Sequence, residues 1–578
     1  MLAPRSKFYQ GPFGRIFPDL PAWEPDVSAG NSAGALEKAV EEEFLRVAND
    51  HMIEVRGPSK SPSELKGSDQ DEKDDSNIPA GYTYFGQFVD HDITFDPISS
   101  LMRQNDPSGL LNHRTPRLDL DNLYGRGPGA SRHLYDADDK FRFAIAHVKS
   151  KKEGTDSEFC IQDLPRIVKT AVDCSEPEES DSNRMAIAAI GDPRNDENII
   201  VSQLHLAFLL AHNKLYDTAI TLIKRKIANA KKIDEAEVEL TGEQQESAFH
   251  QARTTLRWLY QYIVWNDFLR RISNIKIHAA ALQFDAVDKG KKTKFKQWQA
   301  GFKDVYNWKH RPFIPVEFST AAYRFGHTMV RNSYRTNIIR GPQPAHAVPI
   351  FDNSKHNPAP DDLRGNRKLE IKNQIQWNWF LNMEGSEGDF PQKARLLDTK
   401  LANALAFLHE EKLLPGEVVK EPRDRKLNFL AFRNLMRGYR FDLPSGTAVA
   451  HKFCLDPIPL GDDDLDSLWF YILKEAKVQG EGNKLGEVGS MIICATFAGL
   501  LLGDPNSYFN VQPCWQPKED ILLAVALDGT GFNEDSLLVD DEGKSHWTLA
   551  SIIRLSGLPV SADDLQPVTP GGSSASPR

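Results

Sequence analysis

Apolar residues recur at helical spacing along much of the chain. Between Ile199 and Leu222 they stand three and four positions apart and cover most of a helix surface, which predicts a helix in the core. Period-two alternation, typical of half-buried strands, is scarce and short. The pattern therefore predicts a mainly α fold with few short strands. Further helices are expected over Gly34–Ala48, Glu243–Ile272, Thr320–Arg331, Leu397–Leu408, Leu465–Lys477 and Leu485–Leu502.

Polar stretches divide the chain into three parts. Ser59–Asn77 is charged, serine-rich and nearly free of large apolar residues, as in a surface loop or linker. The tail from Pro567 is small, polar and proline-rich, which predicts disorder. We expect an N-terminal extension and linker (residues 1–77), one large body (78–566) and a disordered tail (567–578).

Composition and charge exclude several classes of protein. The 578 residues are 40% hydrophobic and 26% charged, and 70 Lys and Arg stand against 81 Asp and Glu, giving a net charge of -11. No broad basic surface for nucleic acid or an anionic membrane is expected. The five cysteines form no CxxC pair, so neither a disulfide framework nor a zinc module is indicated. The apolar stretch Val488–Gly503 is short for a bilayer and predicts a buried helix, not a transmembrane segment.

The N-terminal sequence lacks the apolar run of a secretory signal peptide, because prolines, glycines and charges interrupt it. Sec export is not indicated. The chain is therefore expected to be cytoplasmic or exported by another route.

Polar side chains concentrate in the segment Gly86–Pro97 (GQFVDHDITFDP). Gln87, Asp90 and His91 share one face of a predicted helical turn, whereas Asp92 points elsewhere. A single histidine in a helix is more often structural than catalytic. This polar density nevertheless favours a functional site, because burying these groups without partners would be costly.

A second polar segment, Gly191–Asn198 (GDPRNDEN), stands directly before the apolar helix that begins near Ile199. Asp196 and Glu197 suit the positive end of a helix, so a simple N-terminal cap is one explanation. Arg194 does not suit that end and is expected to have an anionic or polar partner.

Two later segments add further candidates. Glu317–Arg331 (EFSTAAYRFGHTMVR) has Arg324 and His327 three positions apart, and His327 could equally be a core histidine. In Leu427–Asp442 (LNFLAFRNLMRGYRFD), Asn434 stands among apolar residues, as a buried hydrogen-bonding partner would.

In this order the segments resemble the animal-type haem peroxidases of the peroxidase–cyclooxygenase superfamily. GQFVDHDITFDP is similar to the family's GQ-x-x-DHD, GDPRNDE to its GD-x-R-x-x-E, and AAYRFGHTMV to its AA-x-R-x-GH. TPRLDLDNLYG (Thr115–Gly125) is similar to its calcium loop, and GLLLGDPNSYF (Gly499–Phe509) to a late helix end of its bacterial members. The resemblance covers roughly residues 78 to 505 and implies a single large helical haem-peroxidase body of the bacterial-like kind.

The resemblance implies one haem b. His327 would be its proximal iron ligand, and Asn434 would accept a hydrogen bond from the other ring N–H of that histidine. On the distal side His91 would move the proton of hydrogen peroxide, and Arg194 would stabilise the charge that develops as the O–O bond breaks. The family usually has Arg-Asp-His-Gly after the asparagine, whereas this chain has Arg437–Asp442 (RGYRFD).

Further family positions line the implied haem site. Gln87 would line the distal cavity where small anions bind, and Arg324 would pair with a haem propionate. Asp90 and Glu197 occupy positions that can form ester links to the haem. The residue after Glu197 is Asn198, where one branch of the family has a methionine, so a sulfonium link is excluded.

A calcium ion is also implied, because hard cations take oxygen ligands. Asp92, Thr115, Arg117 through its backbone carbonyl, Asp119 and Asp121 would bind it. The family commonly has serine where this chain has Asp121, which makes the site more anionic.

The function implied is a haem peroxidase that uses hydrogen peroxide to oxidise halide, thiocyanate or phenolic donors through a ferryl intermediate. One alternative is a fatty-acid dioxygenase of the same superfamily, whose radical tyrosine stands three residues before the proximal histidine. That position is Arg324 here, and Tyr323 lies about 100° away around a helix. Another alternative is a non-catalytic calcium-binding or adhesion protein on a peroxidase scaffold.

Overall fold

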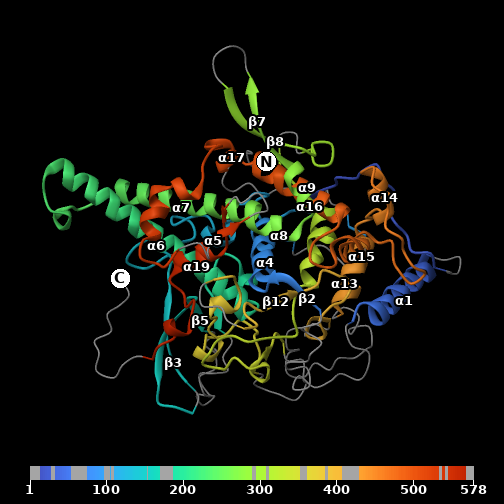
Figure 1. Cartoon of the computed structure of the whole chain (residues 1–578), viewed down its shortest axis with the longest axis horizontal. Helices are drawn as coiled ribbons and strands as arrows, with labels where there is room; N and C mark the ends of the chain where they lie inside the picture. Colours follow the sequence, from blue (N-terminus) through green and yellow to red (C-terminus); the bar gives the residue numbers. More distant parts are fainter. Residues whose placement is uncertain are drawn as a thin grey trace.

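Long helices carry the hydrophobic core of the computed structural model (Figure 1). The structure describes residues 13–27, 33–53, 74–96, 104–105, 110–152, 154–168, 186–288, 294–307, 311–351, 361–383, 388–406, 429–532, 537–539 and 545–567. The helices of these residues are α1 (Ala33–His51), α4 (Gly81–Ile93), α5 (Asp121–Tyr124), α6 (Ile199–Lys231), α7 (Gly242–Ile263), α8 (Arg270–Ile272), α9 (Ile275–Ala281), α10 (Val316–Thr320), α11 (Asn403–Ala406), α13 (Leu430–Arg440), α14 (Gly446–Lys452), α15 (Leu468–Gly480), α16 (Glu487–Gly503), α17 (Tyr508–Val511), α18 (Ile521–Leu527) and α19 (Ala550–Ser556).

Short irregular helical turns complete the helical part. A π-helix, η6 (Val264–Leu269), joins α7 to α8, and two 3-10 helices bear on the site: η4 (Pro193–Asp196) and η7 (Ala322–His327). The other 3-10 helices are η2 (Arg132–Leu134), η5 (Glu235–Glu237), η8 (Pro344–His346), η9 (Ile371–Asn373), η10 (Trp377–Trp379), η11 (Pro517–Glu519) and η13 (Ala562–Asp564).

The strands of the described residues pair two at a time and form no larger sheet. The pairs are β1 (Phe13–Gly14) with β9 (Ile314–Pro315), β2 (Asp75–Pro79) with β12 (Lys393–Arg395), β3 (Ala146–Lys151) with β4 (Glu158–Asp163), β5 (Arg166–Val168) with β6 (Ala186–Ala188), β7 (Leu282–Asp288) with β8 (Lys294–Ala300), β10 (Ser333–Tyr334) with β11 (Val348–Pro349), and β13 (Leu537–Val539) with β14 (Ser545–Trp547). The β1–β9 pair is parallel and the others are antiparallel. The prediction of a mainly α fold with few short strands is confirmed.

The helix α6 begins where the sequence predicts it. The side chain of Asn198 accepts hydrogen bonds from the backbone N–H groups of Ile200 (3.1 Å) and Val201 (2.9 Å), which is a helix N-cap. Nearly every side chain in the first half of α6 is buried, and α6 packs on α4, α7 and α19. The cap is Asn198 and not Asp196, whose carboxylate is paired with Arg166 at 2.6 Å.

Two predicted helices are much shorter than expected. In the segment Thr320–Arg331, α10 ends at Thr320 and the tighter η7 follows, because Nε of Arg324 donates to the carbonyl of Ser319 and closes the end of α10. In Leu397–Leu408 only α11 is helical within the described residues, which end at residue 406. The amides of Leu397 and Leu401 bond instead to carbonyls of Gly482 and Met52, in distant parts of the chain.

The N-terminal residues that the structure describes lie on the helical body. Phe13 and Gly14 pair with Ile314 and Pro315, and the carboxylate of Glu317 accepts the amide N–H of Ile16 and of Phe17. Residues 54–73 lie outside the described residues, so most of the predicted linker is not described, and its last residues form the start of β2. The domain boundary at residue 77 stays a prediction.

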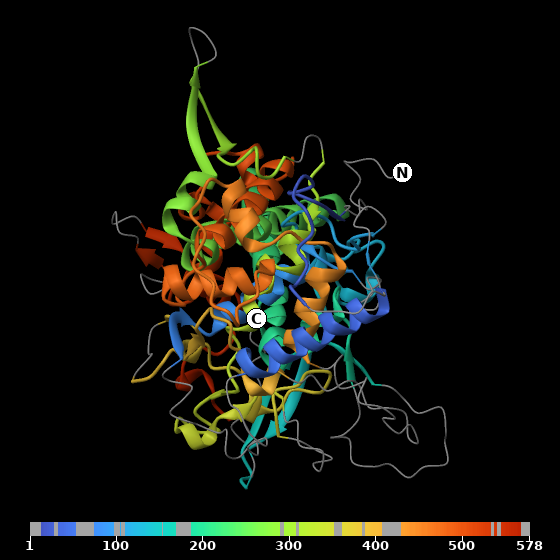
Figure 2. The same ribbon diagram turned by 90° about the vertical axis from the view of Figure 1, so that its right-hand side faces the viewer.

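One hairpin stands out from the rest of the molecule. The β7–β8 hairpin projects away from the helices in both views (Figures 1 and 2). Among the described residues, no helix has both the length and the apolar character needed to cross a bilayer. The stretch Val488–Gly503 lies in α16, which is buried over most of its length, as predicted.

Candidate functional site

Helix α4 presents two sets of polar side chains on opposite faces. Phe85, Phe88 and Val89 are fully buried and anchor the helix, which packs against α6 and η7. His91 lies on the face toward η4, and Asp92 lies on the face toward the loop before α5. The predicted separation of His91 from Asp92 is therefore present in the structure.

His91 is fixed by an asparagine from η4. Nδ1 of His91 lies 2.8 Å from Oδ1 of Asn195, and Nδ2 of Asn195 lies 3.0 Å from Nδ1 of His205. Because the carbonyl oxygen of the amide can only accept, Nδ1 of His91 carries the proton and Nε2 carries a lone pair. Burial, followed by the positive charge of Arg194, lowers the pKa of His91 to about 3. His91 is thus a neutral imidazole whose Nε2 has no partner among the described residues.

Arg194 has the anionic partner that the sequence analysis expected. Its Nε and Nη2 donate to the carboxylate of Asp192 at 3.0 and 2.7 Å. Nη2 also donates to the carbonyls of Thr94 (2.7 Å) and His91 (3.2 Å), and the guanidinium lies 4.6 Å from the ring centre of Phe95. Burial alone would raise the pKa of Asp192, but Arg194 lowers it well below its usual range. Only Nη1 of Arg194 has no partner in the described part of the chain.

Gln87, Glu197 and Asn198 form a connected group across α4 and the start of α6. Nε2 of Gln87 donates to the carboxylate of Glu197, and Nδ2 of Asn198 donates to Oε1 of Gln87 at 3.2 Å. Desolvation by the surrounding protein raises the pKa of Glu197 to about 7, although the side chain is exposed. Burial also raises the pKa of Asp90, which accepts a hydrogen bond from the hydroxyl of Thr94 at 2.9 Å.

His327, Asn434 and Arg324 form a second chain of contacts. Nη1 of Arg324 donates to Oδ1 of Asn434 at 2.9 Å, and Nδ2 of Asn434 lies 2.9 Å from Nδ1 of His327. An arginine cannot accept a hydrogen bond, so it fixes the orientation of the amide. Asn434 therefore donates to Nδ1 of His327, which is the opposite of the direction expected from the sequence. Nε2 of His327 has no partner among the residues described.

Several side chains of the two chains of contacts are only partly buried. Asp90, Arg324 and His327 are half-buried, and Glu197 is exposed. The charges of Arg194 and Arg324 both lower the pKa of Asp90, against the effect of its burial.

Positive charge gathers around Arg324. Burial, and then the charges of Arg437 and Arg433, lower the pKa of Arg324 to about 9. Arg437 is 4.0 Å from the carboxylate of Asp96, whereas Arg433 has no ion pair or hydrogen bond with the residues that the structure describes. Gathering guanidinium groups inside a protein is costly unless an anion accompanies them. The arginines therefore fit a ligand with carboxylate groups.

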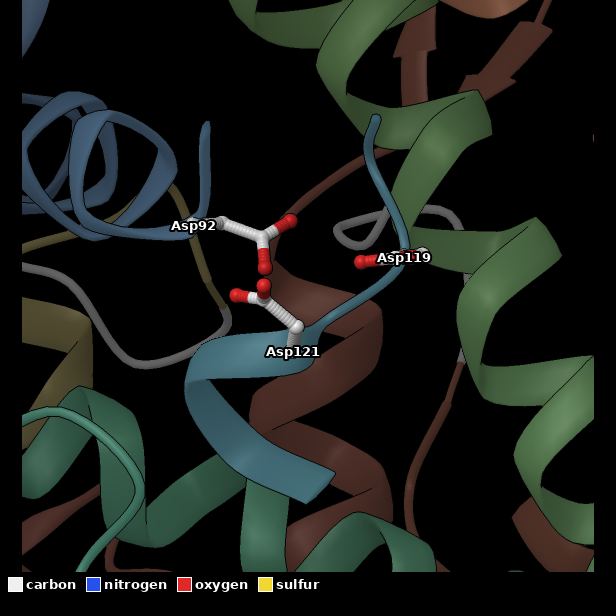
Figure 3. A group of neighbouring side chains, drawn as sticks. All are labelled: Asp92, Asp119 and Asp121. Carbon is white, nitrogen blue, oxygen red and sulfur yellow. The ribbon is translucent and has the colours of Figure 1, made fainter. Parts of the chain in front are cut away.

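The predicted calcium ligands also lie together (Figure 3). Asp92 at the end of α4, Asp119 in the following loop and Asp121 at the start of α5 direct their carboxylates toward one another, with ligand oxygens within 4.8 Å. Leu120 adopts a left-handed conformation (φ 59°), which turns the two flanking aspartates to the same side. Oδ1 of Asp92 is buried without a hydrogen-bond partner, as expected of an oxygen that binds a cation.

The other two predicted calcium ligands lie beside this acidic cluster. The hydroxyl of Thr115 donates to Asp119 at 2.8 Å, and the amide of Thr115 donates to Asp121 at 3.0 Å. Arg117 is buried in the same loop. Burial and the neighbouring aspartates raise the pKa of Asp92 and of Asp121.

Residues 99–361 match the family model described as animal haem peroxidase. The match covers a little under half of the chain, which is thus similar to the animal haem peroxidases over these residues. This match includes the segment of Arg194 and that of His327, which the sequence analysis had assigned to the distal and proximal sides of a haem.

The chain is also similar to known peroxidases. The thyroid peroxidases of Mus musculus and Rattus norvegicus are each 26% identical over 227 residues, which is 39% of this chain and 20% of theirs. The chain thus matches about a fifth of the length of these relatives. The structure of peroxidase A from Dictyostelium discoideum superposes with a TM-score of 0.53 at 15% identity, over 97% of this chain and 95% of that one, and shows the same fold. A fatty acid alpha-dioxygenase from Oryza sativa gives a TM-score of 0.45 at 13% identity, over 90% of this chain and 77% of that one.

The sequence analysis missed the residues that fix the haem-site side chains. Asn195, His205 and Asp192 hold His91 and Arg194, and Arg433 adds charge beside Arg324. Asn195 and Asp192 stand inside the segment that was noted for Arg194. Their role could have been suspected from that position, but nothing in the sequence points to His205 or Arg433.

Proposed function

We propose that the chain is a haem peroxidase that uses hydrogen peroxide to oxidise small anions, such as halide or thiocyanate, or phenolic donors. One observation carries the proposal. His91 on α4 and His327 on η7 each have Nδ1 held by an asparagine, whereas Nε2 has no partner among the described residues. Because α4 and η7 pack on each other, we propose that the two nitrogens face one site.

The residues around His91 and His327 fit a haem. His327 would bind the iron through Nε2, and Arg324, Arg433 and Arg437 would face the two propionates, whose charge balances theirs. When Arg324 pairs with a propionate, Asn434 is free to turn its carbonyl toward Nδ1 of His327, which leaves Nε2 unprotonated for the iron. The bound haem supplies the redox chemistry that reduces the O–O bond of peroxide.

His91 would handle the proton of hydrogen peroxide. Its Nε2 lone pair accepts a proton from the incoming peroxide, and the protonated ring returns it to the departing oxygen, which leaves as water. Asn195 holds Nδ1–H throughout, so the ring keeps one tautomer. Nη1 of Arg194 is the donor left to stabilise negative charge on the departing oxygen.

The site favours small donors over fatty acids. Gln87 and Glu197 line the distal side with polar groups. Tyr323, the tyrosine nearest the dioxygenase position, donates its hydroxyl to the carbonyl of Gly86 at 3.2 Å, and Arg324 occupies the radical position itself. We therefore place peroxidase activity ahead of the dioxygenase alternative, and ahead of a non-catalytic adhesion role because both histidines are in place.

We also propose that Asp92, Asp119 and Asp121 bind calcium with Thr115 and the carbonyl of Arg117. A cation would stabilise three close carboxylates, and oxygen ligands suit calcium. Asp92 adjoins His91 in α4, so the ion would hold the end of that helix.

The test is turnover by haem-loaded protein with hydrogen peroxide against iodide, bromide, thiocyanate, a phenol and linoleate in parallel. We expect oxidation of anions or the phenol, and loss of that activity in His91→Ala. His147→Ala, which alters an exposed histidine of β3, is the matched control. Oxygen uptake with linoleate, without any use of peroxide on the other donors, would refute the proposal in favour of a dioxygenase.

A further inference from the structure

We infer that Trp469 and Trp23 form an electron path from the haem site to the protein surface, which serves electron donors too large to enter the haem cavity. The inference rests on the proposed peroxidase function and extends it to a second class of substrate. The inference is based on the position of the two indoles, which both lie beside Asn434.

Trp469 touches the proximal side of the site directly. It is fully buried near the start of α15, and its indole N–H donates to the carbonyl of Arg324 at 3.4 Å. Arg324 in turn holds Asn434, the partner of His327. An indole this close to the iron ligand is within easy reach of electron transfer to a bound haem.

Trp23 continues the path outward. Trp469, Trp23, Tyr439 and Asn434 line one small cavity, with room for about one water molecule. Trp23 is half-buried, its amide donates to the carbonyl of Leu443 at 2.8 Å, and its ring stacks on Phe44 with centroids 6.1 Å apart. The path therefore leads from a buried indole to one that reaches the surface, beside residues of α1, α13 and α15.

The indoles can pass electrons without moving protons. When Trp469 loses one electron, its N–H stays bonded to the Arg324 carbonyl, whose oxygen stabilises the positive charge. Trp23 then reduces the oxidised Trp469 by one electron, and a donor at the surface reduces the oxidised Trp23. Two donors give one electron each, and with two protons these electrons reduce one hydrogen peroxide to two waters.

Acidic side chains outnumber basic ones around Tyr439. Glu24 adjoins Trp23, and Glu24, Glu37 and Asp442 act on Tyr439 together with Arg440, which is paired with Glu37. Arg15 also lies here and donates to the carbonyls of Phe441 and Asp442. This charge favours a large cationic donor. Reduced cytochrome c, a basic protein that cannot enter the haem cavity, is a suitable probe.

The experiment compares two donors in the haem-loaded protein with hydrogen peroxide. Trp23→Phe should keep iodide oxidation and lose oxidation of reduced cytochrome c. The control is Trp258→Phe, which lies outside the path and, like Trp469→Phe, loses an indole bond to a backbone carbonyl (Asn506, 3.1 Å). It should keep both activities.

A spectroscopic readout tests the buried indole. After peroxide is added without donor, electron paramagnetic resonance should show a tryptophan radical that is lost in Trp469→Phe and kept in Trp258→Phe. Unchanged cytochrome c oxidation in Trp23→Phe, or an unchanged radical in Trp469→Phe, would overturn the inference alone. Absence of iodide oxidation in the unaltered protein would instead overturn the proposed function, and this inference with it.

Discussion

Removing calcium from the acidic cluster of Asp92, Asp119 and Asp121 should destabilise the protein, and the loss should grow as the pH rises. Two ionised carboxylates 4.8 Å apart, the upper limit for the ligand oxygens of this cluster, repel each other by about 3.5 kcal/mol at an effective dielectric of about 20. Arg114, 3.4 Å from Asp121, offsets part of this repulsion. The destabilisation by chelation should therefore reach a few kcal/mol.

The sign of the pH dependence follows from the raised pKa of Asp92 and of Asp121 in the folded protein. In the unfolded chain these groups ionise near pH 4. Without calcium, the folded state therefore holds protons that the unfolded state has released, and stability falls as the pH rises from about 4 through the raised pKa values. Calcium favours the ionised carboxylates and should remove this pH dependence. At a free calcium concentration of about 100 times its dissociation constant, binding should raise the free energy of unfolding by about 2.7 kcal/mol.

The assay is thermal unfolding in calcium and in chelator at matched pH values between 5 and 8. Buried histidines have a lowered pKa, so their contribution to stability rises with pH. This contribution is the same in calcium and in chelator, and it cancels when the two conditions are subtracted. Asp121→Asn should reduce both the calcium effect and its pH dependence, whereas Asp138→Asn, at an exposed site, should change neither. A calcium effect that stays constant or shrinks from pH 5 to pH 8 would refute the reasoning.

Three further predictions concern the haem site. His327→Ala should lose stable haem binding, seen as loss of the Soret band and of the iron–histidine stretch in resonance Raman spectra; an unaltered spectrum would contradict the assignment. His91→Ala should keep haem but slow its reaction with peroxide by about 100- to 10,000-fold in stopped-flow measurements, and Asn195→Ala should slow it by about 10- to 100-fold because the tautomer is no longer fixed. After exposure to peroxide, haem should resist acid-acetone extraction and remain on tryptic peptides that contain Asp90 or Glu197, with no sulfonium link; complete extraction would show that neither ester forms.

Local sequence determined the elements and most of the candidate residues. The spacing of Gln87, Asp90 and His91 placed them in one helix, with Asp92 directed elsewhere, and the apolar pattern after Asn198 predicted a core helix. These features depend on residues three or four apart, so helical periodicity is enough to reveal them. The three aspartates were predicted from the resemblance to the family's calcium loop, since Asp92 in α4 stands 27 positions before Asp119.

Only the tertiary structure decided how these residues are held. Asn195 meets His91 across 104 positions, and Arg324 meets Asn434 across 110. The contact of Arg324 with Asn434 makes Asn434 the donor to His327, whereas the sequence analysis expected it to be the acceptor. The bond from Arg324 to the carbonyl of Ser319 ends α10, so that η7 stands where a longer helix was predicted. Such contacts depend on how α4, η4, η7 and α13 pack together, and no spacing along the chain encodes that arrangement.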